Sequence, residues 1–208
     1  MATLILFLLL LPLSNSWADD LYPGLQVDSK REGSVYTVTA SFDTSLSKCA
    51  AYNYLTDYGA AKELPGVIES VTHRQSANEV KVERTADERI LFFHVRIHSV
   101  MAYTEKPFDS ISFTQLSGDS KLFKGHWEIE PNQHGSTLRF NGLWEPDTLI
   151  PDFVIDYFAK NKLADKFSAV AKLAEKHKSM LSTSCTDRQM LTLGPQAELA
   201  SVHPKLNP

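Results

Sequence analysis

Six strand-length runs with short polar connections fill residues 67–145, and this pattern limits the possible folds more than any other feature of the chain. Turn-forming residues such as Gly118 and Asp119 separate the runs. Consecutive strands joined this closely pair antiparallel, because a parallel pair needs a crossover of a dozen or more residues. We therefore predict an antiparallel meander with strands at 67–74, 79–84, 90–103, 110–116, 121–130 and 136–145.

Two further elements precede the meander. Residues 35–42 alternate between apolar side chains and mostly hydroxyl-bearing ones, which is typical of a half-buried strand. Leu46, Cys49, Ala50 and Tyr54 then recur at helical spacing, which predicts a helix over 46–58. A short helical turn at 60–64 should end before Pro65, since a proline disfavours helical backbone in the residue before it.

One long amphipathic helix is predicted over 151–180, where apolar residues recur at helical spacing and lysines crowd the final turn. An antiparallel sheet with one apolar face needs a cover, and this helix is the natural one. We therefore predict a single α+β domain.

The ends of the chain differ from the domain. Residues 4–13 form an apolar run, and Ser16 and Ala18 complete a cleavage pattern, so residues 1–18 are interpreted as a signal peptide despite the lack of an early Lys or Arg. A permanent anchor is the alternative, but a spanning helix needs about 20 apolar residues. We expect an exported protein, periplasmic or secreted, with an extension at 19–33, a domain at 34–180 and a tail at 181–208.

The chain contains two cysteines, Cys49 and Cys185, and export would allow them to pair as a disulfide. A buried thiol at Cys49 and a free or intermolecular thiol at Cys185 remain open alternatives. A structural zinc site is disfavoured, because two isolated cysteines cannot supply four ligands.

Charge and motif content argue against several functions. A formal net charge of −4 provides no attraction for a phosphate backbone, so nucleic acid is not expected as a partner. The chain lacks a phosphate-binding glycine loop, a Gly-x-Ser-x-Gly elbow and an HExxH helix, and nothing in it indicates a cofactor or a metal. His94, Arg96 and His98 share one face of a predicted strand, and the opposite, apolar face must point inward. We predict no catalytic residues.

The candidate binding residues are aromatic side chains that the sheet and the helix should direct toward each other. The helix also carries Asn161, which could orient a ligand or could simply bond to backbone at a helix bend. Concave, mostly apolar spaces of this kind are the usual sites for small molecules. The predicted set is Phe113, Trp127, Phe140 and Trp144 from the strands and Phe153, Tyr157, Phe158 and Asn161 from the helix.

Several short segments carry a resemblance to a known family. They are LTDY at 55–58, LPGV at 64–67, SGD at 117–119, FKGHW at 123–127 and GST at 135–137. In this order and spacing the chain resembles the START-like superfamily, specifically its polyketide cyclase and coenzyme Q-binding branch, over about 35–178. The resemblance implies a helix-grip fold, in which a curved antiparallel sheet of about seven strands wraps around a long C-terminal helix, and it implies no catalytic residues.

The expected function is that of an exported binder or carrier of a hydrophobic small molecule, such as a lipid, an isoprenoid quinone or a polyketide-like molecule. Two alternatives remain: a cyclase or dehydratase that uses the same cavity, and an interaction module that holds no ligand. We expect a monomer that contacts membranes only transiently to load its ligand.

Overall fold

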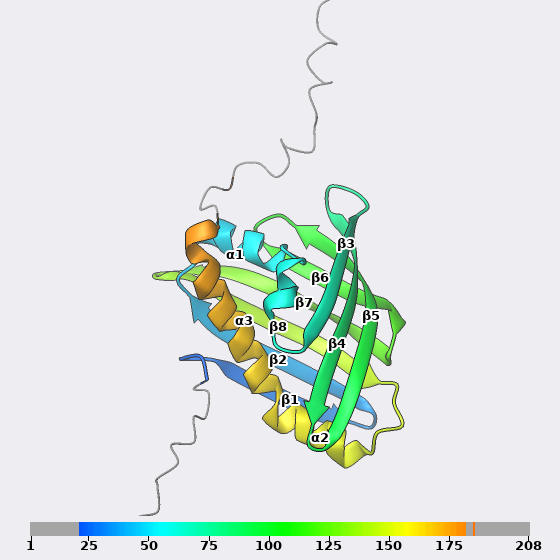
Figure 1. Ribbon diagram of the computed structural model, residues 1–208. Coiled ribbons are helices and arrows are strands. Elements are labelled where there is room, and N and C mark those ends of the chain that lie inside the picture. Colours follow the sequence, from blue (N-terminus) through cyan, green and yellow to red (C-terminus); the bar gives the residue numbers. More distant parts are fainter. Residues whose placement is uncertain (1–20, 182–184, 186–208) are drawn as a thin grey trace, which may run out of the picture.

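The computed structural model describes residues 21–181 and 185, and it has one curved sheet with helices on its concave side (Figure 1). The strands are β1 Gln26–Glu32, β2 Val35–Thr44, β3 Val67–Arg74, β4 Glu79–Ile90, β5 Phe93–Lys106, β6 Ser110–Gly118, β7 Ser120–Asn132 and β8 Gly135–Pro146. The helices are α1 Lys48–Leu55, η1 Ala60–Glu63, α2 Asp152–Asn161, α3 Leu163–His177 and η2 Lys178–Met180.

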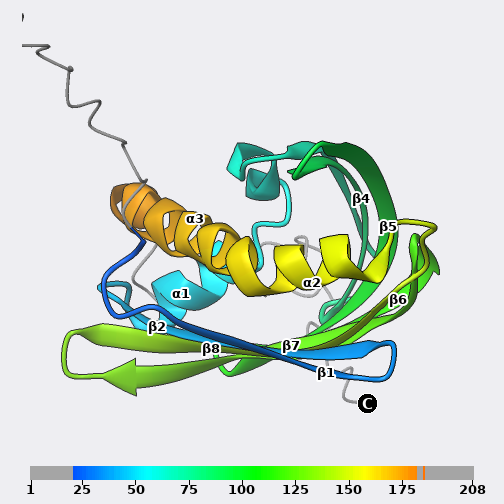
Figure 2. The same cartoon turned by 90° about the horizontal axis from the view of Figure 1, so that it is seen from below.

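The sheet is antiparallel throughout, in the order β1-β2-β8-β7-β6-β5-β4-β3. The meander from β3 to β8 pairs each strand with the next, and β2 pairs with β8, so the first and last strands of the predicted domain lie side by side. The sheet curls from β1 and β2 toward β4, with the helices α1, α2 and α3 on the hollow side (Figure 2). The prediction of an α+β helix-grip fold is confirmed.

Two facing glycines make room for the aromatic side chains of the sheet. Gly125 on β7 pairs with Gly142 on β8. A Cβ atom at Gly125 would lie 2.9 Å from the Cζ atom of Phe113, and one at Gly142 would lie 2.8 Å from that of Phe140. The rings therefore lie over backbone that has no side chain, which is a common way for aromatic residues to stabilise a glycine in a strand.

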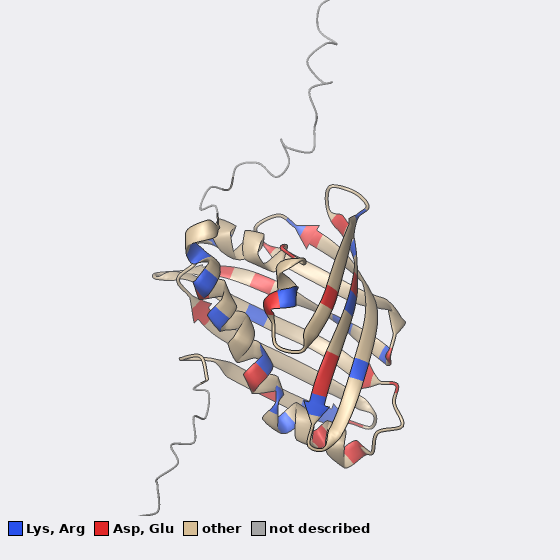
Figure 3. Ribbon diagram, in the orientation of Figure 1, with Lys and Arg blue, Asp and Glu red and all other residues tan. Residues whose placement is uncertain are grey.

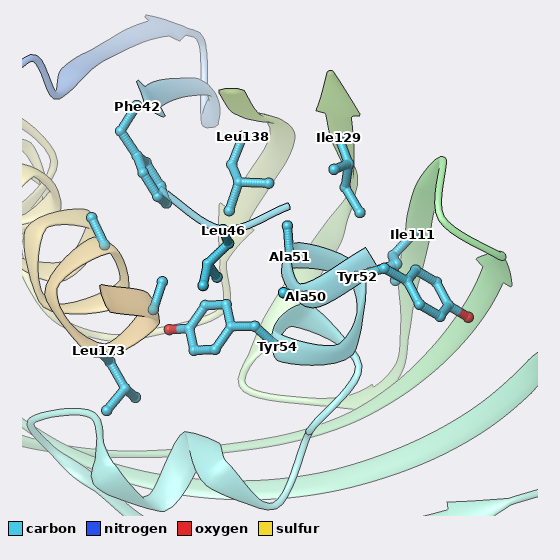
Figure 4. Close-up of a cluster of buried hydrophobic side chains, with 12 residues drawn as sticks. Phe42, Leu46, Ala50, Ala51, Tyr52, Tyr54, Ile111, Ile129, Leu138 and Leu173 are labelled. Atoms are coloured by element: carbon cyan, nitrogen blue, oxygen red, sulfur yellow. The ribbon is translucent and has the colours of Figure 1, made fainter. Parts of the chain in front are cut away.

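The main core lies between α1, α3 and the sheet (Figure 4). Helix α1 begins at the N-cap Ser47, whose side chain accepts a hydrogen bond from the amide of Ala50. Its buried face packs between the strands and α3, and Ala51, Leu138 and Ala174 are fully buried there. Apolar burial of this kind is the dominant stabilising contribution to the fold.

The helix prediction over 151–180 requires one correction. The structure has two helices, α2 and α3, that meet at Lys162, which ends the first and begins the second. The bend lets α2 reach across the hollow from β1 to β4, while α3 lies over β1 and β2 next to α1 (Figures 1 and 2).

The strand predictions differ from the structure at two places. An eighth strand, β1, lies within the segment 19–33 that the sequence placed in an extension. The turn expected at Asp87 and Glu88 lies instead at Leu91 and Phe92, with Leu91 in the left-handed region at φ 57°. The polar pair Asp87 and Glu88 suggested a turn, but each side chain has a partner within the fold.

The disulfide partners lie far apart in the chain. Cys49 on α1 is bonded to Cys185, across a sequence separation of 136 residues. The predicted signal peptide at 1–18 and nearly all of the predicted tail at 181–208 lie outside the described residues. Within the part that is described, no helix has the length and apolar character required to cross a membrane.

Candidate functional site

One cavity on the helix side of the sheet lies between α2 and the turn end of β4 and β5. It has a volume of about 540 Å³, within the usual range of small-molecule sites. Its wall is mostly apolar and also includes five polar residues. The apolar lining, from β4, β5, β8, the loop after β8 and α2, is Ile90, Val95, Ile97, Trp144, Pro146, Leu149, Ile150, Ile155 and Phe158. We call this space the outer cavity.

A second space, which we call the inner cavity, lies further along β4 and β5, toward α1 and η1. It measures about 170 Å³. Its lining combines aliphatic and aromatic side chains with three tyrosines and one arginine. The lining residues include Tyr54, Leu55, Tyr58, Leu64, Arg84, Tyr103, Ile111, Trp127, Val170 and Leu173.

Four predicted residues lie on the cavity side of the sheet. Trp127 lines the inner cavity and Trp144 lines the outer one. Phe113 is only 6% exposed, and its ring stacks on that of Phe140 with centroids 5.9 Å apart. Phe140 also packs against Trp127 and Phe167, so these aromatic rings form one continuous cluster beneath α3.

The predicted helix residues are divided. Phe158 lines the outer cavity and packs against Trp144. Phe153 is 60% exposed, and Asn161 is exposed and donates its amide to the backbone oxygen of Tyr157 at 2.9 Å. Tyr157 is half-buried and lines neither cavity. The prediction that Phe153 and Asn161 face inward was wrong. It assumed one continuous helical period over 151–180, and the bend at Lys162 interrupts that period.

Two of the three tyrosine hydroxyls of the inner cavity have partners. Tyr54 donates to the backbone oxygen of Val170 at 2.7 Å, and Tyr58 donates to Glu105 at 2.9 Å. Burial raises the pKa of both phenols, and the nearby carboxylate of Glu105 raises that of Tyr58 further. Both groups therefore stay protonated at neutral pH and cannot serve as bases.

Glu105 is the most deeply buried carboxylate near the inner cavity, at 4% exposure. Arg74 pairs with it through both terminal nitrogens at 3.1 Å, and Tyr52 and Tyr58 donate their hydroxyls to it. The oxygen atoms of this carboxylate are thus occupied by a cation and two hydroxyls of the fold, which is a structural role.

Arg84 is the functional candidate that the sequence analysis missed. It lines the inner cavity from β4. The signal was present, because Val80 and Val82 face inward and alternation along a strand places Arg84 on the same side. The predicted strand 79–84 ended at Arg84, so this residue was taken for a strand end, whereas the strand continues for six more residues, to Ile90.

The histidine-bearing face of β5 is exposed as predicted. His94, Arg96 and His98 are exposed, and Arg96 pairs with Asp87 on the neighbouring strand at 2.9 Å. Among the described residues, no group of three or more His, Cys, Asp or Glu side chains is arranged to hold a metal. Acidic and basic residues are interspersed along β4 and α3 (Figure 3).

A family model described as polyketide cyclase / dehydrase and lipid transport matches residues 45–195. The chain belongs to this family. The match spans the helices and strands that enclose both cavities. No curated protein sequence matches the chain.

Solved structures similar to this member of the polyketide cyclase / dehydrase and lipid transport family have low sequence identity. A STAR-related lipid transfer protein fragment from Xanthomonas axonopodis is 16% identical, with 74% of this chain and 94% of that chain covered and a TM-score of 0.61. A Thermus thermophilus protein is 13% identical, covering 69% and 97%, with a TM-score of 0.59. The Zhui aromatase/cyclase from a Streptomyces species is 14% identical, covering 69% and 95%, with a TM-score of 0.55. These similarities establish the fold.

Proposed function

We propose that this protein is an exported binder or carrier of a hydrophobic small molecule, such as a lipid, an isoprenoid quinone or a polyketide-like molecule. The observation that carries the proposal is the outer cavity, whose volume and apolar lining suit such a ligand. At about 25 cal/mol per Å², a ligand that buries a few hundred Å² of apolar surface gains several kcal/mol before entropy is counted.

The hydrogen bonds of the polar groups near the inner cavity favour a carrier function over catalysis. The tyrosines Tyr54 and Tyr58 have raised pKa values and donate to fixed partners, and Glu105 is held by Arg74. A cyclase or dehydratase needs a base or acid free to reach the substrate. These groups are occupied with structural contacts.

Export is supported by the apolar run and cleavage pattern at the start of the chain and by the Cys49–Cys185 bond, since disulfides persist in oxidising compartments. Leu149 is fully exposed beside the outer cavity, and Phe92 is 80% exposed in the adjoining β4–β5 turn. These side chains suit a transient membrane contact by a monomer. Slower transfer of a fluorescent lipid between vesicles by the Phe92→Ser, Leu149→Ser variant would support this contact, and an unchanged rate would contradict it.

Native mass spectrometry with organic extraction tests the carrier function on protein purified from its own exported compartment. We expect a stoichiometric apolar ligand in the wild type. Ile97→Trp should fill the outer cavity and remove most of that ligand, whereas His98→Trp, on the opposite face of β5, should retain it. An unliganded wild type that no lipid or quinone shifts in mass would overturn the proposal.

A further inference from the structure

Arg84 extends into the interior of the protein from the middle of β4. Val82, two residues earlier on the same face, is fully buried. Arg84 lines the inner cavity together with Ile111 and Trp127. A long cationic side chain thus occupies a wall that is otherwise made largely of apolar and aromatic groups.

The guanidinium of Arg84 has no partner among the described residues. Its Nε atom is buried and lacks any hydrogen bond, and no ion pair joins the side chain to a described carboxylate. Of the five other arginines of the sheet, Arg89 is exposed to solvent, and the remaining four each pair with a carboxylate: Arg31 with Asp152 and Asp156, Arg74 with Glu105, Arg96 with Asp87, and Arg139 with Glu130.

The carboxylates around the inner cavity are committed elsewhere. Glu88, on the same face of β4, binds the Nζ atom of Lys166 at 2.5 Å. Glu105 is bound by Arg74. Asp57 lines the cavity at its exposed side and accepts a hydrogen bond from the amide of Ala60 at 3.2 Å. None of the three forms an ion pair with Arg84.

The sheet leaves space beside the Arg84 side chain. Its cross-strand neighbours are Ser70 on β3 and Ser99 on β5. Directly opposed residues in antiparallel strands have Cβ atoms about 5 Å apart, so small serines on both sides leave room for another group next to the guanidinium. Ser70 already donates its hydroxyl to the backbone oxygen of Tyr58 at 2.7 Å.

The Arg84 side chain is half-buried, and its buried Nε atom makes no hydrogen bond. An unsatisfied buried polar atom is costly, and a planar guanidinium binds carboxylates and phosphates through two parallel hydrogen bonds. We propose that Arg84 binds the anionic head group of an amphiphilic ligand, a carboxylate or a phosphate monoester, whose apolar chain lies along the concave face of the sheet. The inference rests on the proposed function and narrows its ligand class from hydrophobic molecules to acidic amphiphiles.

The test compares three probes with the same ten-carbon chain, decanoate, decyl phosphate and decanol, by calorimetric titration of the full mature protein. Acetate and inorganic phosphate serve as head groups without a chain. Because a hydrogen bond to a charged group contributes about 1.5–3 kcal/mol, the wild type should bind at least one anionic probe about tenfold or more tightly than decanol. The head groups alone should bind at least tenfold more weakly than the matching probe with a chain.

Two variants identify the residue responsible. Arg84→Met removes the charge at similar length and should abolish the preference for the anionic probes while leaving decanol binding within about threefold. Arg89→Met is the matched control, since Arg89 is an exposed arginine on the opposite face of the same strand, and it should preserve the preference. Circular dichroism establishes that each variant is folded.

The possible outcomes distinguish the role of Arg84 from the proposed carrier function. Equal binding of decanol and both anions by the wild type, or a preference that survives in folded Arg84→Met, would overturn the role of Arg84 and leave the carrier function standing. Tight binding of free phosphate or acetate without a chain would show a site for small anions and would also overturn it. No binding of any ten-carbon probe would contradict the carrier function itself.

Discussion

At the residue scale, Arg74 and Arg84 differ in their effect on the stability of the fold, because only Arg74 has an acidic partner among the described residues. Arg74 neutralises Glu105, which is 4% exposed. Arg84 has a buried Nε atom and no partner in the described part of the chain. The first arginine stabilises the folded state, and the second is retained at a cost in stability, as is common for groups that serve binding.

Replacement of each arginine by methionine should change stability in opposite directions. Arg84→Met should raise the free energy of unfolding of the ligand-free protein by about 1 kcal/mol, because an unpaired buried polar group is removed. Arg74→Met should lower it by about 3 kcal/mol, because it leaves the Glu105 carboxylate buried without its cation. Urea unfolding of the two variants measures both changes, and a similar loss in both would contradict the difference in roles.

At the element scale, Glu175 joins α3 to the segment between β2 and α1. Its carboxylate accepts hydrogen bonds from the hydroxyl of Thr44 and the amide of Ser45, both at 2.7 Å, and from the hydroxyls of Ser45 and Tyr22. Burial works to raise the pKa of Glu175, but these hydrogen bonds outweigh it and hold the pKa below its ordinary value of 4.5.

The lowered pKa gives this contact a defined pH dependence. A carboxyl group with a lower pKa in the folded state stabilises the fold above its unfolded pKa and loses that contribution as the pH falls through the folded value. Glu175→Gln should therefore be about 1 kcal/mol less stable than the wild type at pH 7, and the difference should shrink below about pH 4.5. Thermal unfolding across this range measures it, and a difference that is constant with pH would count against the prediction.

The sequence predicted the elements well where a period was long and unbroken. The meander from β3 to β8 and the aromatic positions Phe113, Trp127, Phe140 and Trp144 follow from alternation alone. The prediction failed where the periodic pattern is interrupted at a single position. The bend at Lys162 contains no proline or glycine, and Arg84 continues an inward alternation that its charge conceals. The strand β1 has mixed polarity, because it is an edge strand with one neighbour.

At the scale of the whole molecule, the Cys49–Cys185 bond closes a loop that includes nearly the entire domain. It links α1 to the chain beyond η2, so the last helices are held to the core by a covalent bond as well as by packing. A cross-link over 136 residues restricts the unfolded chain strongly.

Removal of the disulfide should destabilise the protein without changing its fold. We expect Cys49→Ser, Cys185→Ser to lower the free energy of unfolding by about 3 kcal/mol. The same loss should appear when the wild type is unfolded in the presence of a reductant, and the double variant should be insensitive to the reductant. Identical stability of the wild type and the variant in oxidising buffer would show that the bond does not form in solution.

The central claim is that an apolar chain binds between the sheet and the helices, and the tryptophans provide a direct test. The chain has three tryptophans, Trp17, Trp127 and Trp144. A protein that begins at Asp19 retains Trp127 in the inner cavity and Trp144 in the outer one.

Bromine quenches indole fluorescence on contact, so titration with a brominated decanoate measures access to these cavities. We predict saturable quenching that is reduced in Trp127→Phe and in Trp144→Phe. Calorimetric binding of the same probe without saturable quenching would contradict the claim.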